Sequence, residues 1–160
     1  MLTPGAAPLR IILFNRQEMV RHGLRHAVAW MQDNAYSADL CAMTELALAE
    51  ALNNIVEHAY NEDVIGVIEL LLEGLPDGVK CTLIDEGQGL PGGEIPSDSQ
   101  PDTDVALDDL PEGGFGWHIL LSLTETVDYE RSFDTNRLSF TMRQEAEVSS
   151  AEPKADNAHP

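Results

Sequence analysis

The spacing of hydrophobic residues along the chain predicts an ordered series of strands and helices. Leu9–Phe14 is a run of mostly apolar residues, which predicts a first strand. After this run the apolar residues recur every three or four positions, which is typical of a helix with one buried side. Asn15 and Glu18 have the spacing of a capping box at the start of this helix. Its buried side is expected to carry Val20, Leu24, Ala27, Val28 and Met31.

A second helix is predicted from Ser37, which has the side chain of a good N-cap, to about Ala59. Its apolar side is expected to consist of Leu46, Ala47, Ala51 and Ile55. Glu50, Asn54 and His58 are each four positions apart, so their side chains lie along one flank of the helix. Taken alone, this spacing fits a solvated face, since burying such groups costs free energy unless each has a partner.

The second half of the chain consists of short apolar runs separated by turn residues. The turn Pro76-Asp77-Gly78 joins two of these runs, which predicts an antiparallel hairpin. A third helix is predicted after Gly114-Phe115-Gly116, because apolar residues then return to helical spacing from Trp117 to Leu121. The predicted strands are 64–72, 79–84, 127–131 and 138–142.

These elements predict one domain over residues 9–144, which is long enough to enclose a core. Residues 1–8 are expected to be a flexible leader and 145–160 a disordered tail. The segment of about 91–113 is rich in Gly, Pro, Ser and Asp and has little apolar periodicity. A loop of this length is usually a functional lid or disordered.

The chain is strongly acidic, with 28 Asp and Glu against 9 Lys and Arg and a formal net charge of −19. It is therefore not expected to bind nucleic acid, whose phosphates are bound by Lys and Arg. No apolar run is long enough to span a membrane and the N-terminus lacks a secretion signal, so a cytoplasmic location is expected. Cys41 and Cys81 lack metal-ligand spacing and are expected to be reduced core residues.

The positions of the basic residues limit how a phosphate could be bound. No Lys or Arg occurs between Arg25 and Lys80, or between Lys80 and Arg131. A phosphate bound by these regions would have to be held by a metal ion, by backbone N–H groups and by helix ends.

The residues after the second predicted strand of the hairpin suit the base of a nucleotide. Asp85 stands at the end of that strand, where its carboxylate can accept a hydrogen bond from an amino group such as that of adenine. Gly87 and Gly89 allow the backbone to approach a flat ring closely.

The other polar positions suit the phosphates. Gly114 and Gly116 expose N–H groups at the start of a predicted helix, which is a favourable place for an anion. Asn54 offers an amide oxygen to Mg²⁺, an ion that also bridges phosphate oxygens. Glu50 lies one turn before Asn54, near enough to accept a proton from an attacking hydroxyl group or water.

In this order, the three elements resemble the N-box, G1 box and G2 box of the GHKL superfamily of gyrase, chaperone, histidine-kinase and mismatch-repair ATPases. The segment Glu50-Ala-Leu-Asn-Asn54-Ile-Val-Glu-His58-Ala-Tyr60 is similar to the N-box of the compact anti-sigma-factor serine kinases, and the likeness extends from about Leu9 to Arg143. The resemblance implies an α/β sandwich, the Bergerat-type ATP-binding fold, with helices packed on one face of a mixed, mostly antiparallel sheet.

The resemblance also implies a role for each polar position, with ATP and Mg²⁺ as cofactors. Glu50 would be the catalytic base, Asn54 the Mg²⁺ ligand and Asp85 the adenine anchor. His58 would close the nucleotide pocket or brace the end of its helix. The positions that would contact the base or the phosphates, below a lid of about 91–113, are Gly87, Gly89, Gly114, Phe115 and Gly116.

Members of the resembled family sequester a sigma factor and phosphorylate a serine on a STAS-type anti-sigma-factor antagonist, and a PP2C-type, metal-dependent phosphatase reverses the phosphorylation. The resemblance thus implies an anti-sigma factor that acts as a serine-protein kinase in a partner-switching module regulating transcription. It also implies a homodimer, which the apolar N-terminal helix could serve.

Two departures from the family pattern keep a second hypothesis open. Some anti-sigma kinases carry an arginine close to the second glycine box, where this chain has Pro111, Glu112 and Gly113. The expected lid and its flanks are also acidic, and acid beside a polyphosphate is repulsive unless metal or solvent screens it. These acids are Glu94, Asp98, Asp102, Asp104, Asp108, Asp109 and Glu112. The alternative is a nucleotide-binding sequestering regulator with little or no kinase activity.

Overall fold

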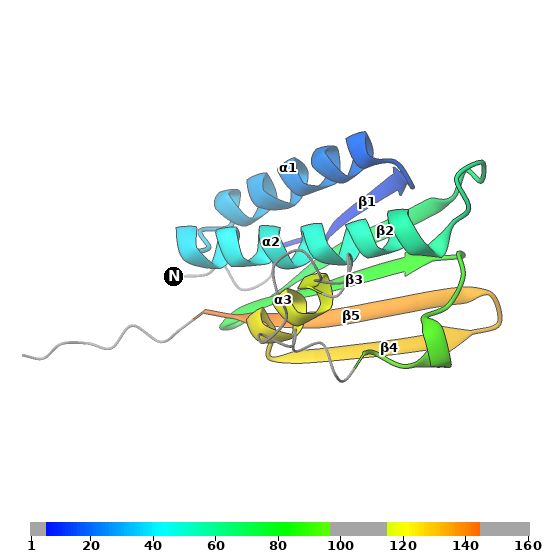
Figure 1. Cartoon of the computed structure of the whole chain (residues 1–160). Coiled ribbons are helices and arrows are strands. Elements are labelled where there is room, and N and C mark those ends of the chain that lie inside the picture. The colour runs from blue at the N-terminus through cyan, green and yellow to red at the C-terminus, as the bar shows by residue number, and fades with distance from the viewer. Residues whose placement is uncertain (1–5, 97–114, 145–160) are drawn as a thin grey trace, which may run out of the picture.

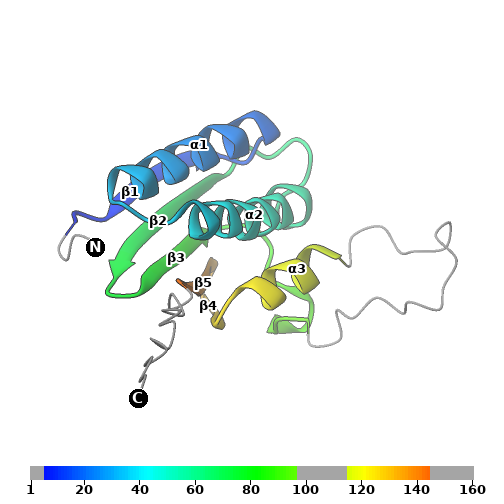
Figure 2. The same ribbon diagram turned by 90° about the vertical axis from the view of Figure 1, so that its left-hand side faces the viewer.

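The computed structural model describes residues 6–96 and 115–144, which form a five-stranded antiparallel sheet with helices on one face (Figures 1 and 2). The strand order is β1-β2-β3-β5-β4. The strands are β1 Leu9–Phe14, β2 Val67–Leu75, β3 Gly78–Asp85, β4 Thr126–Ser132 and β5 Thr135–Arg143. The helices are α1 Gln17–Asp33, α2 Ala38–Asn54, η1 Ile55–Ala59, η2 Pro91–Gly93 and α3 Phe115–Leu123. The predicted fold class is confirmed.

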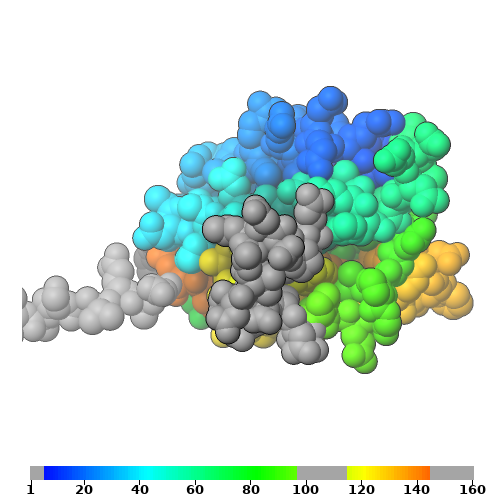
Figure 3. Space-filling view, in the orientation of Figure 1, coloured from blue at the N-terminus to red at the C-terminus, as the bar shows by residue number. Residues whose placement is uncertain are grey.

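Helix α2 lies over the middle of the sheet, and α1 lies beside it to form one continuous outer layer (Figures 2 and 3). Ser37 caps α2 as predicted, because its hydroxyl oxygen accepts a hydrogen bond from the Leu40 N–H at 3.2 Å. The buried face of α2 is made of small and aliphatic residues, including Ala47, Leu48 and Ala51. The prediction for Leu46 was wrong: its side chain is 45% exposed, because the buried stripe passes through Leu48 instead.

The last turn of the predicted second helix is wider than an α-helix. Residues Ile55–Ala59 form a π-helix that continues α2 directly, so the helical stretch ends at Ala59 as expected. The change falls immediately after Asn54. A π-turn rotates the side chains that follow it relative to those before it, and such turns are frequent at functional sites.

Asn15 does not cap α1, contrary to the prediction of a capping box. The residue before the helix is Arg16, which makes no capping hydrogen bond with its side chain. The Asn15 side chain instead binds the chain across from it, where its amide donates to the Val64 carbonyl at 2.9 Å and accepts from the Gly66 N–H at 2.8 Å. These hydrogen bonds engage the Val64 carbonyl and the Gly66 N–H, so β2 begins three residues later than predicted, at Val67.

The apolar side of α1 faces the sheet. Gly23 packs against Leu13 so closely that a Cβ at Gly23 would lie 2.7 Å from the Leu13 side chain. Val20, Ala27 and Met31 are buried with it. The fold therefore uses this apolar stripe itself, and the participation of the first helix in a dimer stays a prediction.

The opposite face of the sheet carries exposed apolar side chains at its β1 edge. Ile12 and Phe14 on β1 are each 52% exposed. Val67, the cross-strand partner of Phe14 on β2, is 47% exposed. These three side chains, which we call the outer-sheet patch, alternate along their strands with the buried Leu13 and Ile68 and so lie on the face opposite the helices.

Both predicted hairpins form, and their register determines what lies at the end of β3. β2 pairs with β3 and β4 pairs with β5, as expected. β5 also pairs with β3, which places Asn136 opposite Asp85. Arg131 on β4 is in turn the cross-strand partner of Asn136. Three polar residues from three strands therefore stand in one row across the sheet.

Several predictions concern residues outside the described ranges. Most of the expected leader, most of the expected lid and the whole tail lie in 1–5, 97–114 and 145–160. Within 6–96 and 115–144, no helix has the length and hydrophobicity needed to cross a lipid bilayer. Cys41 and Cys81 are buried free thiols, as predicted.

The β4–β5 turn generates a test of the fold, because Phe133 adopts a left-handed conformation with φ of 54°. Its side chain is 98% exposed, so no burial offsets the steric cost of a Cβ in that region. We expect Phe133→Asn to stabilise the protein by about 1 kcal/mol, a rise of about 3 °C in Tm, because Asn tolerates this conformation. Phe133→Ala, which removes the ring but keeps the strained Cβ, should give no such rise in a thermal melt.

Candidate nucleotide-binding site

A cavity of about 350 Å³ lies between the end of the second helix, the loop after β3 and the start of α3. Its apolar walls are formed by Ala51, Ile55, Ala59, Leu90, Trp117 and Leu138. Its polar lining comes from Asn54, His58, Asp85, Gln88, Tyr129 and Asn136. Four predicted site residues, Asn54, His58, Asp85 and Gly89, therefore line one cavity although they come from distant parts of the sequence.

Asp85 lies at the buried end of this cavity and is only 5% exposed. Its Oδ1 accepts hydrogen bonds from the Gly87 N–H at 2.8 Å and from the Asn136 amide at 2.9 Å. Burial raises the pKa of Asp85, and the hydrogen bonds from Asn136 and Gly87, with the charge of Arg131, oppose that rise. Among the described contacts only Oδ1 is engaged, which leaves Oδ2 as an acceptor on a residue of the cavity wall.

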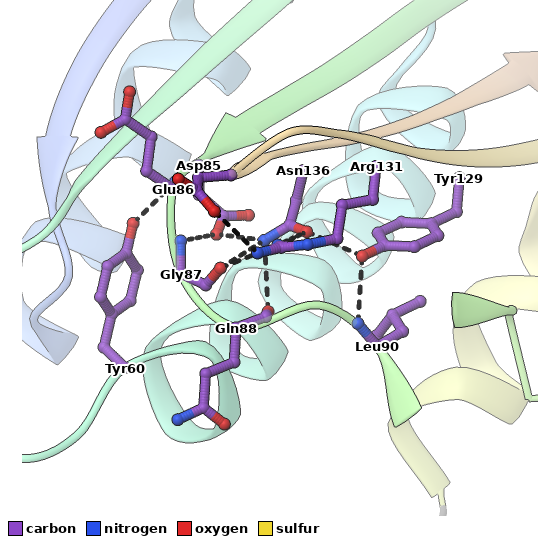
Figure 4. A network of polar contacts seen from close by, with 10 residues as sticks. Tyr60, Asp85, Glu86, Gly87, Gln88, Leu90, Tyr129, Arg131 and Asn136 are labelled. Atoms are coloured by element: carbon purple, nitrogen blue, oxygen red, sulfur yellow. Dashed lines mark hydrogen bonds and ion pairs between the residues drawn. The ribbon is translucent and has the colours of Figure 1, made fainter. Parts of the chain in front are cut away.

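Asn136 links Asp85 to the loop that follows it (Figure 4). Besides Asp85, its side-chain nitrogen contacts the Gly87 carbonyl at 3.1 Å and the Gln88 carbonyl at 3.2 Å. Its Oδ1 accepts from the Tyr129 hydroxyl at 2.8 Å and from Arg131. Both polar ends of this buried amide are thus satisfied by the protein.

The two glycines of the Asp85 loop pack against different neighbours. A Cβ at Gly87 would lie 2.5 Å from the Ala59 carbonyl oxygen, so Gly87 allows the loop to approach the end of the π-helix. A Cβ at Gly89 would lie 2.9 Å from the Arg131 side chain. Gly89 lines the cavity, whereas Gly87 is not among its lining residues.

Tyr60 ties the helix end to the same loop. Its hydroxyl accepts a hydrogen bond from the Glu86 N–H at 3.1 Å and donates one to the Val67 carbonyl at 3.3 Å. Its ring occupies the space beside Gly66, where a Cβ would lie 2.1 Å from a ring carbon. The aromatic residue that ends the predicted N-box therefore joins η1, β2 and the loop after β3.

Glu50 and Asn54 face the start of α3. A Cβ at Gly116 would lie 2.6 Å from the Glu50 carboxylate oxygen Oε2 and 3.8 Å from the Asn54 amide oxygen. The Asn54 side-chain nitrogen is buried and has no hydrogen-bond partner among the described residues. A buried amide without a partner costs free energy, which makes Asn54 a place where a ligand could contribute the missing contact.

The remaining predicted site residues are placed less centrally. His58 lines the cavity, but its side chain is 63% exposed. Its Nε2 lies 3.9 Å from the Glu57 carboxylate oxygen Oε2, and the two form an ion pair only when the imidazole is protonated. Phe115 is 39% exposed and does not line the cavity. Gly114 lies outside the described residues.

The prediction from sequence missed three residues of the site, namely Tyr129, Arg131 and Asn136. They belong to the β4–β5 hairpin, in which Asn136 is 51 residues from Asp85 and Arg131 is 44 residues from Gly87 along the sequence. A signal was available for Arg131, because it is the first basic residue after Lys80. Only the pairing of β5 with β3 shows that this charge lies beside the Asp85 loop.

Comparison with known proteins agrees with this geometry. The profile of the histidine kinase-like ATPase domain matches residues 14–142. The serine-protein kinase RsbW of Staphylococcus aureus is 35% identical over 85 residues, which are 52% of this chain and 54% of that protein. The chain thus spans about half the length of the curated relatives it matches.

Solved structures show a similar fold. The RsbU and RsbW domains of Rv1364c from Mycobacterium tuberculosis match with a TM-score of 0.59 and 20% identity, over 86% of this chain and 32% of that one. A blue-light activated histidine kinase of Erythrobacter litoralis matches with a TM-score of 0.50 and 19% identity, over 67% of this chain and 31% of that one. At these identities the likeness concerns the fold alone.

The different surroundings of Gly87 and Gly89 generate a test of the site geometry. Gly87→Ala would force a methyl group against backbone, so we expect it to destabilise the protein by about 1–3 kcal/mol. Gly89→Ala is the matched control, because its methyl group would meet side-chain atoms of Arg131 and Tyr129 rather than backbone, so the neighbours can adjust at a smaller cost. Urea melts of the two variants should separate them clearly; equal destabilisation would contradict the close approach of Gly87 to Ala59.

Proposed function

The chain belongs to the histidine kinase-like ATPase family, and from this premise we propose that it is an ATP- and Mg²⁺-dependent anti-sigma factor with serine-protein kinase activity. The observation that carries the proposal is the convergence of Asp85, Asn54 and Glu50 around one cavity and the start of α3. The similarity to a serine-protein kinase of S. aureus supports the reaction class.

Asp85 is the residue that we propose to anchor the base. Its second carboxylate oxygen can accept a hydrogen bond from the exocyclic amino group of adenine, which the carbonyl group of guanine could not provide. Trp117, Leu138 and Ile55 supply apolar walls for the faces of the ring. Gly89 provides a stretch of wall without a side chain, whereas Gly87 acts indirectly by letting the loop pack on Ala59.

Asn54 is the residue that we propose to hold Mg²⁺, and its surroundings fit that ion. Within the described residues no group of three or more His, Cys, Asp or Glu side chains could enclose a metal. Mg²⁺ bound with nucleotide is commonly held by one or two protein oxygens together with phosphate oxygens and water. The side-chain oxygen of Asn54 can serve as such a ligand, and its buried, unpaired nitrogen can donate a hydrogen bond to a phosphate oxygen.

Glu50 is the proposed catalytic base. Bound ATP with its metal supplies the phosphoryl group. Glu50 accepts the proton of the incoming serine hydroxyl as that oxygen forms its bond to the γ-phosphorus and the bond to the β-phosphate oxygen breaks. Gly116 lets the N-terminus of α3 come close to Glu50, since any larger residue would push against the carboxylate. Gly114 and Phe115, at the same helix start, are proposed to complete the phosphate contacts.

For the whole protein we propose a partner-switching role. Residues 9–144 would form the nucleotide-binding domain, with the lid over the cavity and the leader and tail outside it. The proposed partners are a sigma factor and a STAS-type anti-sigma-factor antagonist, which receives the phosphate on serine, and a PP2C-type phosphatase that acts on the same antagonist. Because sigma factors act in the cytoplasm, we propose that location for this protein. His58, at the rim of the cavity, is proposed to close it over bound nucleotide.

A nucleotide-binding sequestering regulator is the second candidate, and one observation favours it. No Lys or Arg is among the described residues that line the cavity. Arg131 lies nearby, but its guanidinium is bound to the Gly87 carbonyl at 2.9 Å and to Asn136, at the base end of the site. A kinase would have to neutralise the transferred phosphate with metal, backbone N–H groups and residues beyond the described part of the chain.

Two substitutions separate nucleotide binding from phosphoryl transfer. Saturating Mg²⁺-ATP should stabilise the wild type by about 2.7 kcal/mol at a hundred times Kd, and Asp85→Asn should abolish that thermal shift. Glu50→Gln should keep the thermal shift but stop transfer, read as the intact mass of the STAS-type partner after incubation with Mg²⁺-ATP. Glu45→Gln on the exposed side of the same helix is the control and should transfer normally.

The outcomes discriminate between the candidates. No thermal shift with any adenine nucleotide would overturn both. If Mg²⁺-ATP shifts the Tm of the wild type but the STAS-type partner gains no phosphate, the sequestering regulator would be favoured. Normal transfer by Glu50→Gln would show that another group is the base.

We propose that the outer-sheet patch of Ile12, Phe14 and Val67 forms the interface of a homodimer. Phe14→Glu should then shift the protein to monomer in sedimentation velocity, because a charge in a buried apolar contact is costly. Leu46→Glu is the control, since Leu46 is also exposed, at 45%, but lies on the helical layer. A Phe14→Glu variant that sediments like the wild type would exclude this interface.

A further inference from the structure

The Asn136 amide is held by contacts on both of its ends, and these contacts are not equivalent. Its nitrogen faces three acceptors, namely Asp85 Oδ1 and the carbonyl oxygens of Gly87 and Gln88. Its oxygen faces two hydrogen-bonding groups on β4, Tyr129 and Arg131 (Figure 4). The orientation of the amide thus decides whether Asp85 meets a donor or an acceptor.

Arg131 fixes the oxygen end of this amide, while the three acceptors around the nitrogen fix the other end. A guanidinium can only donate hydrogen bonds, whereas the Tyr129 hydroxyl can donate or accept. With Arg131 in place, only the oxygen of the amide can face β4, so the nitrogen must face Asp85. Without Arg131 the amide would keep its nitrogen toward the three acceptors, but its oxygen and the Gly87 carbonyl would both lose the contact with the guanidinium that holds them in place.

We propose that Arg131 is a positioning residue for the base-binding end of the cavity: it orients Asn136 and thereby keeps Asp85 and the 87–88 loop in the form that accepts an amino group. The inference rests on the proposed nucleotide function. It assigns to Arg131 a role distinct from phosphate binding, because the guanidinium is held by Gly87 and Asn136 and is absent from the cavity lining.

The position of Arg131 on the sheet supports this role. Asp85, Asn136 and Arg131 are successive cross-strand partners, so their spacing is set by the backbone ladder rather than by flexible side chains. The Arg131 side chain is 32% exposed, and its contact with Asp134 at 3.9 Å is at the periphery. Its inner contacts, to Gly87 and Asn136, are the ones that reach the site.

Charge acts in the same direction as the hydrogen bonds. The titratable groups around Asp85 are Arg131 and Tyr129 on β4, Tyr60 and His58 at the helix end, and the neighbouring Glu86. Of these, Arg131 is the cation whose attraction opposes the burial-induced rise in the pKa of Asp85. Loss of Arg131 should therefore let Asp85 take up a proton at a higher pH, and a protonated carboxyl is a poorer acceptor for adenine.

The test compares Arg131→Met, which removes the donors and the charge, with Arg131→Lys, which keeps a donor-only cation. Calorimetric titration with Mg²⁺-ATP should show Kd raised about tenfold or more for Arg131→Met and largely restored for Arg131→Lys. Arg137→Met is the matched control: it removes the same charge from the same hairpin, next to Asn136, but on the opposite face of the sheet. It should leave Kd unchanged.

A second readout needs no nucleotide. The ¹³C resonance of the Asp85 carboxyl, followed through a pH titration of the nucleotide-free protein, should show its midpoint at higher pH in Arg131→Met than in the wild type or Arg137→Met. This resonance reports Asp85 itself. If Arg131 were only a structural support, its removal would lower Tm without moving the midpoint of the Asp85 titration.

A double-substitution cycle tests whether Arg131 acts through Asn136. In an Asn136→Ala background, Arg131→Met should raise Kd by a smaller factor than it does in the wild type, because the amide that it orients is gone and only its contact with the Gly87 carbonyl and its charge remain. If the two substitutions raise Kd independently of each other, Arg131 does not act through Asn136. The proposal would also be overturned if Arg131→Met left both Kd and the Asp85 midpoint unchanged. If the wild type binds no nucleotide, the proposed function fails, whereas the Asp85 midpoint still decides the role of Arg131.

Discussion

Burial of the Asp85 carboxylate is the constraint on which the site depends. A carboxylate that is almost completely removed from water is tolerated only when donors surround it. The donors come from the residue two positions on and from a neighbouring strand, so the loop after β3 and the β4–β5 hairpin must both be in place. These contacts engage one carboxylate oxygen, and the other is the atom that we propose to accept a hydrogen bond from the amino group of a flat ring in the cavity.

The second helix joins this base-binding end to the proposed catalytic end. Its buried face packs on the sheet, and its flank carries Glu50 and Asn54 toward α3. After Asn54 the helix widens into a π-turn, which brings Ala59 against Gly87 and Tyr60 against the backbone of Glu86. One continuous helical stretch therefore fixes the distance between the two ends of the site, and packing of the core and geometry of the site cannot vary independently.

The sequence predicted the parts of this arrangement that local patterns determine. Strand β1, the Ser37 cap, both hairpins and the end of the helical stretch at Ala59 follow from alternation, helical spacing and turn residues. The family resemblance indicated which of the polar positions would share a site, and Asn54, His58, Asp85 and Gly89 do line one cavity.

Local patterns could not predict contacts that depend on the tertiary arrangement. Asn15 has the spacing of a cap, yet its amide finds better partners in the backbone at 64–66, across the gap between β1 and β2. Leu46 belongs to an apolar series, but the helix rotates Leu48 into the core instead. Arg131 and Asn136 look like ordinary strand residues until the register of β5 on β3 places them beside Asp85.

That register also has a consequence for protein synthesis. α1, α2 and the β2–β3 hairpin can leave the ribosome and pack before the residues that contact Asp85 have been synthesised. A nascent chain would therefore acquire its nucleotide site only once β5 has emerged and paired with β3.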